Sequence, residues 1–188
     1  NMGLSIDAEE ADRLEISLDV IEAVLADPEL AGWDGFGVVV QAYGKRAPAV
    51  LDWLSALAER HDRRLAVRLV KGAYWDAEIK RAQVEGLEGF PVYAHKSATD
   101  VAFICCARKL LDAPRLFPQF ATHNAHTAAA ILRMGADPRD YEFQRLHGMG
   151  EALHETLRAR HGTRHRIYAP VGAHRDRLAY LVRRLLEN

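Results

Sequence analysis

The stretch Leu65-Ala-Val-Arg-Leu-Val70, followed at once by Lys71-Gly-Ala-Tyr-Trp75, decides how the rest of the chain is interpreted. Apart from Arg68, its first six residues are apolar and mostly Leu or Val, as in a strand buried on both faces of a parallel sheet. Lys71-Gly72 ends the strand, and a helix is predicted from there to about Val84. A strand joined directly to a helix is the repeating unit of α/β proteins.

The same alternation continues on both sides of this unit. Further strands are predicted at residues 38–43, 117–122, 141–146 and 166–171, and a possible sixth strand ends at Asp7. Helices are predicted from Asp7 to the Asp27-Pro28 pair and at residues 46–61, 99–111, 125–134, 150–160 and 175–186.

Strands joined through helices run parallel, in a sheet that the helices cover. The predicted strands are fewer than the eight of a closed (β/α)8 barrel, which usually takes ~250 residues. An open doubly wound sheet suits 188 residues better. Length alone leaves these two architectures undecided.

The composition is that of a single folded domain. Of 188 residues, 49% are hydrophobic and 27% charged, which excludes disordered and coiled-coil classes. The 25 basic and 26 acidic residues balance, so a general nucleic-acid binder is not expected. No apolar run reaches the ~18 residues of a membrane span, and no signal pattern is evident. The two cysteines, Cys105 and Cys106, are adjacent and form no disulfide framework, which favours a cytoplasmic location.

Polar residues follow nearly every predicted strand. They are Asp7, Gln41, Arg68 with Lys71, Thr122 with His123 and Asn124, Gln144 with His147, and Tyr168. Ligands of α/β proteins bind beyond the carboxyl ends of the strands. The repetition therefore predicts one shared pocket, although separate solvated loops are the alternative.

Arg68 is the most informative of these residues. Strand alternation places it on one face with Ala66 and Val70, away from Leu65, Val67 and Leu69. A guanidinium within a parallel strand must meet an acid or an anionic ligand, and a purely structural ion pair is the alternative. Lys71-Gly72-Ala73 is predicted to open the next helix and to offer backbone N–H groups to an anion.

The last helix carries a second candidate site. Tyr180, Arg183, Arg184 and Glu187 share one helical face. Two adjacent arginines can bind a small carboxylate in bidentate fashion. A solvated face with an Arg183–Glu187 pair explains the pattern equally well.

The histidines and glycines give weaker signals. His123, His126 and His147 imitate a metal site, but no acidic or cysteine ligand stands at ligand spacing beside them, so a metal is not expected. Gly148-Met-Gly150 lacks the third glycine of a dinucleotide fingerprint, and no P-loop is present. His161 and His165 lie in a basic stretch and are expected to face solvent.

Five segments together resemble the proline dehydrogenase family, in order and over essentially the whole chain. They are Val39-Val-Gln-Ala-Tyr43, Arg68-Leu-Val-Lys-Gly-Ala-Tyr-Trp75, Ala121-Thr-His-Asn124, Leu146-His-Gly-Met-Gly-Glu151 and Tyr180-Leu-Val-Arg-Arg184. The Arg68–Trp75 string is the most specific of them, and the bifunctional bacterial members of the family are the most similar.

The resemblance implies a distorted (β/α)8 barrel that binds FAD non-covalently and oxidises L-proline to Δ1-pyrroline-5-carboxylate, with electrons passed to a quinone. It implies one FAD-binding domain over residues 1–188 that holds only the later strands and helices, because the family's substrate-binding lysine lies on an earlier strand. It further implies a linked pyrroline-5-carboxylate dehydrogenase domain, possible peripheral attachment to the inner face of the cell membrane, and no nucleic acid bound through this segment.

The resemblance also assigns roles to individual residues. Asp7 and Arg68 match the catalytic pair. The matching cofactor contacts are Ala8, Gln41, Arg68, Val70, Lys71, Gly72, Ala73, Trp75, Thr122, His123, Asn124 and Glu187. The matching substrate contacts are Tyr74, Leu146, Tyr168, Tyr180, Arg183 and Arg184.

Two other interpretations stay open on the residues alone. A metal-dependent hydrolase on a similar barrel would use His123, His147 and Asp7 as ligands. A non-catalytic interaction module would use the Arg183/Arg184 face to bind an acidic partner.

Overall fold

Strands and helices alternate along the computed structural model, which describes residues 2–172 and 182. The strands are β1 (Leu4–Ile6), β2 (Phe36–Gln41), β3 (Leu65–Val70), β4 (Leu116–Ala121), β5 (Glu142–Leu146) and β6 (Arg164–Tyr168). The α-helices are α1 (Leu14–Ala26), α2 (Ala47–Arg60), α3 (Trp75–Val84), α4 (Lys96–Leu111), α5 (Ala125–Arg133) and α6 (Glu151–His161). Two 3₁₀ turns, η1 (Ala11–Arg13) and η2 (Pro28–Leu30), flank α1. The predicted helix at 175–186 lies outside the described residues, apart from Val182.

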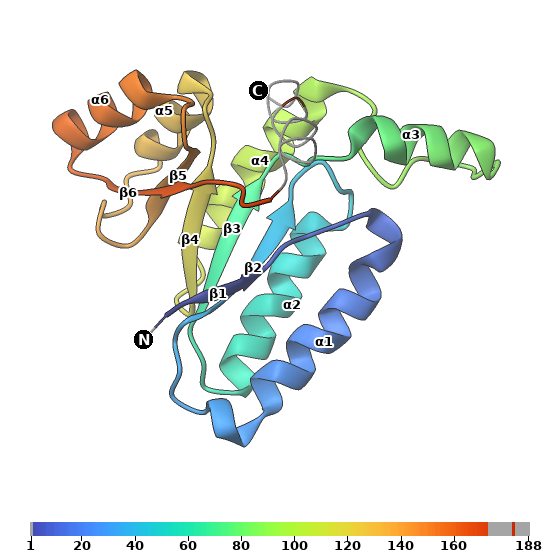
Figure 1. Cartoon of the computed structure of the whole chain (residues 1–188), viewed down its shortest axis with the longest axis horizontal. Coiled ribbons are helices and arrows are strands. Elements are labelled where there is room, and N and C mark those ends of the chain that lie inside the picture. Colours follow the sequence, from blue (N-terminus) through green and yellow to red (C-terminus); the bar gives the residue numbers. More distant parts are fainter. Residues whose placement is uncertain (1, 173–181, 183–188) are drawn as a thin grey trace.

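The strand order decides between the two predicted architectures. Within the described residues, the six strands form one parallel sheet in the order β1-β2-β3-β4-β5-β6 (Figure 1). A doubly wound sheet reverses direction at a switch point, and this sheet does not. Right-handed crossovers that always step the same way put the covering helices on the same face, as in a β/α barrel. Helix α3 instead extends away from the sheet beyond the ends of the strands (Figure 1).

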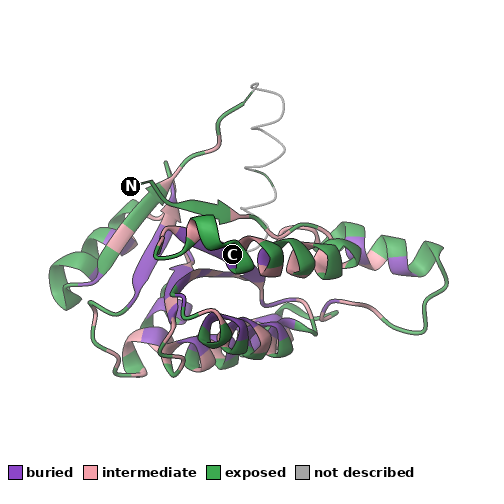
Figure 2. Ribbon diagram, turned by 90° about the horizontal axis from the view of Figure 1, so that it is seen from below, coloured by how far each residue is buried: buried purple, intermediate pink, exposed green. Residues whose placement is uncertain are grey.

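The hydrophobic core lies between the sheet and these helices. Leu65, Val67 and Leu69 of β3 are fully buried, which confirms the predicted alternation. They belong to one apolar cluster with Leu54 of α2 and Phe103 of α4. The buried residues lie along the strands and on the helix sides that face them (Figure 2). Burial of each such side chain stabilises the fold by ~1.5–3 kcal/mol. This apolar layer therefore fixes the positions of the strands, whose other face carries the polar side chains.

Three predicted boundaries were wrong in ways that affect the site. The segment after Asp7 is not helical until η1, so residues 7–10 form an irregular loop. Helix α3 begins at Trp75 rather than at Lys71, because Gly72 has φ +141° and the Ala73 N–H is held by a side chain of another strand. Strand β6 ends at Tyr168 rather than at residue 171, since Pro170 has no N–H to continue the ladder.

The remaining shifts are small. Strand β2 begins and ends two residues earlier than predicted, and α4 begins three residues earlier, at Lys96. Within the described residues, no helix combines the length and apolarity that a membrane span requires.

Candidate active site

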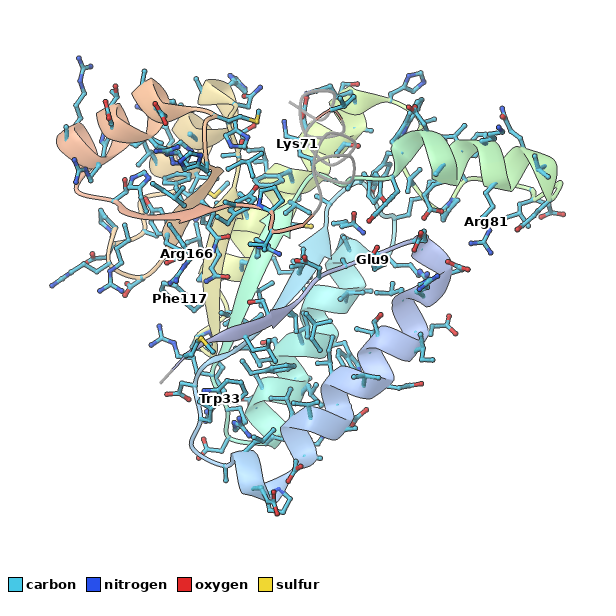
Figure 3. All side chains as sticks on the ribbon, in the orientation of Figure 1. Glu9, Trp33, Lys71, Arg81, Phe117 and Arg166 are labelled. Carbon is cyan, nitrogen blue, oxygen red and sulfur yellow. The ribbon has the colours of Figure 1, made fainter. Side chains whose placement is uncertain are left out.

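Polar residues from five strand ends line one cavity of about 410 Å³. This confirms the predicted shared pocket for Asp7, Gln41, Arg68, Lys71, Thr122, His123 and Tyr168. Lys71 and Glu9 lie beyond the carboxyl ends of the strands, whereas Trp33 lies near the amino ends (Figure 3). The cavity therefore lies at the end of the sheet where ligands of α/β proteins bind.

Arg68 lines this cavity and contacts residues from both edges of the sheet. It forms an ion pair with Asp7, and its Cζ atom lies 5.6 Å from the ring centroid of Tyr168. Asp7 follows the first strand of the sheet and Tyr168 ends the last one. In a flat sheet β3 would lie ~10 Å from β1 and ~14 Å from β6, so these contacts require side chains that lean inward across a concave face. The acid predicted to meet Arg68 is therefore Asp7.

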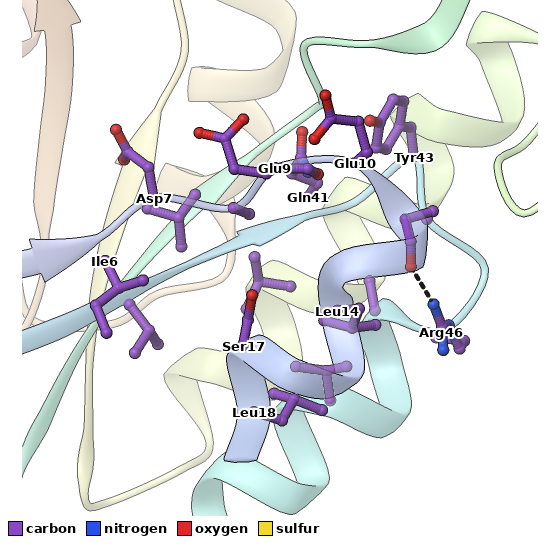
Figure 4. A pocket seen from close by; sticks show the side chains of 18 of the residues that line it. Ile6, Asp7, Glu9, Glu10, Leu14, Ser17, Leu18, Gln41, Tyr43 and Arg46 are labelled. Atoms are coloured by element: carbon purple, nitrogen blue, oxygen red, sulfur yellow. Dashed lines mark hydrogen bonds between the residues drawn. The ribbon is translucent and has the colours of Figure 1, made fainter. Parts of the chain in front are cut away.

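Gln41 connects the loops after β1 and β3, which form part of the rim of this cavity. Its Nε2 donates to the carbonyl of Glu9 (2.8 Å), and its Oε1 accepts from the N–H of Ala73 (3.1 Å). Tyr74 reinforces the contact, because its hydroxyl donates to Glu9 Oε2 (2.8 Å). Figure 4 shows Asp7, Glu9 and Gln41 beside the small apolar cavity beneath the first of these loops. The loops after β1 and β3 are thus held together at the site.

Lys71 leads into a second, larger cavity of about 640 Å³, which shares Lys71, Ala73 and Tyr74 with the first. Lys71 Nζ lies 2.6 Å from Asp100, although burial lowers the pKa of the lysine. Lys96 binds the same carboxylate at 2.9 Å. The two lysines that share Asp100 offer ammonium groups to an anion in the cavity, whose lining also includes the carboxylate of Asp76. The prediction that Lys71-Gly72-Ala73 opens the helix was wrong. Any attraction of an anion at this point therefore comes from the lysine side chains and not from backbone N–H groups at a helix start.

The turn Thr122–Asn124 follows β4. Thr122 is buried, and its Oγ1 accepts from the N–H of Asn124 (3.1 Å). Asn124 caps α5 by accepting from the N–H of Thr127 (3.0 Å). His123 Nε2 accepts from the N–H of Leu146 (3.0 Å), and burial lowers the pKa of His123 to about 4. His123 is therefore neutral at neutral pH and fixed in orientation.

The structure places the other predicted residues as follows. The lining of one or both cavities includes Ala8, Val70, Gly72, Ala73, Tyr74 and Trp75. Asn124, Gln144, Leu146 and His147 line neither cavity. Tyr180, Arg183, Arg184 and Glu187 lie outside the described residues. The cofactor and substrate roles of all these residues stay predictions.

The metal interpretation finds no support in the geometry. His123 Nε2 already accepts a backbone hydrogen bond, and His147 is exposed and outside the cavity. Within residues 2–172 and 182, no three His, Cys, Asp or Glu side chains are placed to hold a metal ion.

The prediction that His165 faces solvent was wrong. Its ring is half-buried, lies against Phe143 with centroids 6.0 Å apart, and contacts the ring of His154. Burial lowers the pKa of His165 to about 4. His161, in contrast, is exposed as predicted.

Sequence reasoning missed a polar network on the concave face. Glu142, whose side chain is 7% exposed, accepts from Nε2 of Gln119 (2.9 Å) and of Gln144 (2.7 Å) and from Nε of Arg166 (2.7 Å). Register pairs Arg68 with Gln119 and Gln119 with Glu142, so these three residues share a face. In the sequence these polar residues alternate with the apolar Phe120 and Phe143, and this pattern could have predicted that they line one face of the sheet.

Comparison with known proteins agrees with this geometry. The family model described as proline dehydrogenase matches residues 1–188. The bifunctional protein PutA of Salmonella typhimurium is 62% identical over 197 aligned residues, which span all of this chain and 15% of that protein. Proline dehydrogenase 1 of Arabidopsis thaliana, a mitochondrial protein, is 30% identical over 79% of this chain and 32% of that protein.

Solved structures show the same likeness. A mutant of proline utilization A from Bradyrhizobium japonicum superposes with a TM-score of 0.93 at 64% identity, over 98% of this chain and 19% of that one. The Bdellovibrio bacteriovorus protein inactivated by N-propargylglycine superposes with a TM-score of 0.91 at 37% identity, over 99% of this chain and 20% of that one.

Fold and site together define part of a β/α barrel with an ionic centre at the carboxyl ends of its strands, which confirms the predicted fold class. The chain belongs to the proline dehydrogenase family. It spans about 15% of the length of the bifunctional relatives that it matches.

Proposed function

We propose that this chain provides the cofactor-binding and catalytic part of an enzyme that oxidises L-proline to Δ1-pyrroline-5-carboxylate with FAD. In this proposal a hydride passes from C5 of proline to N5 of the flavin, and the electrons continue to a quinone. The observation that carries it is the Arg68–Asp7 ion pair at the concave end of a barrel that belongs to the proline dehydrogenase family.

The residues present fit FAD. The cofactor has a negatively charged pyrophosphate and a broad ring with a polar edge, and it needs cations next to extended surface. Arg68, Lys71 and Lys96 supply the cations along two adjoining cavities. The volumes of about 410 and 640 Å³ are in the usual range for ligand sites. In the proposal these residues hold FAD, with Trp75 and the Thr122–Asn124 turn.

FAD supplies the redox chemistry, since it can accept a hydride from a carbon next to an amine. The task of Arg68 is to stabilise negative charge at the polar edge of the ring. Asp7 orients Arg68, and Gln41 keeps the two rim loops together. No nucleophile is required.

Substrate recognition is assigned to aromatic and cationic groups. Tyr74 and Tyr168 line the first cavity and would enclose the proline ring. Arg183 and Arg184 would bind the proline carboxylate, which is a positioning task that presents C5 to the cofactor.

The partners follow from the same proposal. The similar PutA proteins are named bifunctional, and we extend this to a linked pyrroline-5-carboxylate dehydrogenase region in the natural protein. The location of the natural protein in the cytoplasm, with peripheral attachment to the inner face of the membrane, stays a prediction.

The test is the absorbance spectrum of the complete natural protein under anaerobic conditions, before and after L-proline is added. We expect bound flavin whose yellow colour bleaches with proline and persists with pyrrolidine, which lacks the carboxylate. A fully folded protein that takes up no added FAD would refute the proposal.

A further inference from the structure

His154 of α6 and His165 of β6 form a hydrogen-bonded pair. Their Nδ1 atoms are 2.9 Å apart. His154 is only 3% exposed, and its Nε2 lies 3.0 Å from the carbonyl oxygen of Thr122. On the other side, His165 Nε2 lies 2.7 Å from Oγ1 of the buried Thr163. A continuous series of polar contacts thus runs from β6 to the turn after β4.

One set of proton positions satisfies the whole series. A carbonyl can only accept, so His154 Nε2 carries a hydrogen and donates to Thr122. A neutral ring has one N–H, so His154 Nδ1 accepts from Nδ1–H of His165. The Thr163 hydroxyl then donates to His165 Nε2. Buried polar groups satisfied in this way have defined positions.

The carbonyl held by His154 belongs to the turn Thr122–Asn124. Gly150, the residue before α6, leaves room for the ring of His123: it has φ +65°, and a Cβ there would lie 2.9 Å from Cδ2 of His123, which is too close, but at an ordinary contact distance of 3.5 Å from Cδ2 of His154. A side chain at this position would therefore displace His123. The ring centroids of His123 and His154 are 6.2 Å apart.

We propose that His154, itself oriented by His165, is a positioning residue that holds the Thr122–Asn124 turn in place for the cofactor. The inference rests on the proposed function, because it takes this turn as part of the flavin site. His154 acts through the Thr122 carbonyl and has no part in the redox step.

The pair can take up one further proton without losing these contacts. That proton enters at His165 Nε2, where the Thr163 hydroxyl can rotate to accept it, while Nδ1–H of His165 still donates to His154. Burial lowers the pKa of both rings, that of His165 to about 4. The charged and titratable groups that act on the pair are Arg145 and Glu142 of β5, Arg158 of α6 and His123 of the turn. All but Glu142 are cationic or neutral, so protonation stays unfavourable until the pH falls well below 6.5.

Two variants of His154 separate its contacts, because an Asn amide reaches the Nδ1 position and a Gln amide reaches the Nε2 position. His154→Asn loses the bond to Thr122, whereas His154→Gln keeps it. His161→Asn, on the exposed part of the same helix, is the matched control. In the complete natural protein without flavin, amide hydrogen exchange of residues 122–127 should be about tenfold faster in His154→Asn and unchanged in the other two.

The second measurement is FAD affinity. At neutral pH, His154→Asn should bind FAD about tenfold more weakly and His154→Gln within about threefold of the parent, as expected for one buried hydrogen bond. His165→Asn, which keeps a donor to His154, should also bind FAD within about threefold of the parent.

Equal exchange in His154→Asn and His161→Asn would overturn the inference, as would equal FAD affinity in the two His154 variants. If His154→Asn does not fold, His154→Gln and His165→Asn decide the matter by the same readouts. A parent that binds no FAD would refute the proposed function and the cofactor role of the turn, and the exchange data would still report whether His154 holds it.

Discussion

Arg68→Met should damage flavin reduction far more than it damages folding. The Arg68 side chain is 20% exposed and that of Asp7 is 68% exposed. Breaking a fully buried ion pair costs ~3–5 kcal/mol, mainly because one charge is left buried and unpaired. Here the remaining charge would be Asp7, which water already reaches. We therefore expect a loss of only about 1 kcal/mol in the free energy of unfolding, close to the value for partly exposed pairs.

The effect on the reaction should be larger. A preorganised donor that stabilises developing charge is worth ~2.7–4 kcal/mol, or ~10²–10³ in rate. The assay is anaerobic flavin reduction by proline, normalised to the folded fraction, together with the denaturant midpoint. The matched control is Arg64→Met, near the amino end of the same strand, where Arg64 lies over the ring of Phe117 at 5.4 Å.

The refuting result is a loss of several kcal/mol in stability with normal reduction per folded molecule. In that case the Arg68–Asp7 pair would be purely structural. Asp7→Asn tests the same point from the other partner and should slow reduction less than Arg68→Met, because Arg68 stays in the cavity.

Three further predictions follow. Arg183→Met and Arg184→Met should each weaken proline binding by roughly 10- to 100-fold with little change in melting temperature; equal inhibition of parent and variants by a five-membered ring acid would contradict this. Flavin reduction should rise from neutral to alkaline pH, because hydride leaves more easily from carbon next to a neutral amine; a flat profile in stable enzyme would count against it. Glu142→Gln should cost about 2–3 kcal/mol, because an amide cannot accept from Arg166 and both glutamines at once; a denaturant midpoint like that of the exposed Glu151→Gln would show that the network is dispensable.

Hydrophobic periodicity is a local property, and within residues 2–172 it was enough to predict the order of the strands and helices, but not all of their boundaries. The alternation in Leu65–Val70 set which residues of β3 face the helices and which face the concave side. Because parallel strands all end at the same edge, it also predicted that Asp7, Arg68 and Thr122 share a cavity. The family followed from strings of residues that local pattern alone does not explain.

The strand order and the partners of the polar groups depended on contacts between distant segments. Sequential pairing from β1 to β6 is a property of the whole sheet, so length and periodicity could not separate a barrel from a doubly wound sheet. His165 was taken for a surface residue because its neighbours in sequence are basic, yet it packs on Phe143 and bonds His154. Likewise, Lys71 meets Asp100, which lies on a helix one turn beyond Lys96. The burial and the ion pairs of a side chain depend on the residues that pack against it in the folded protein. Those residues need not be its neighbours in the sequence.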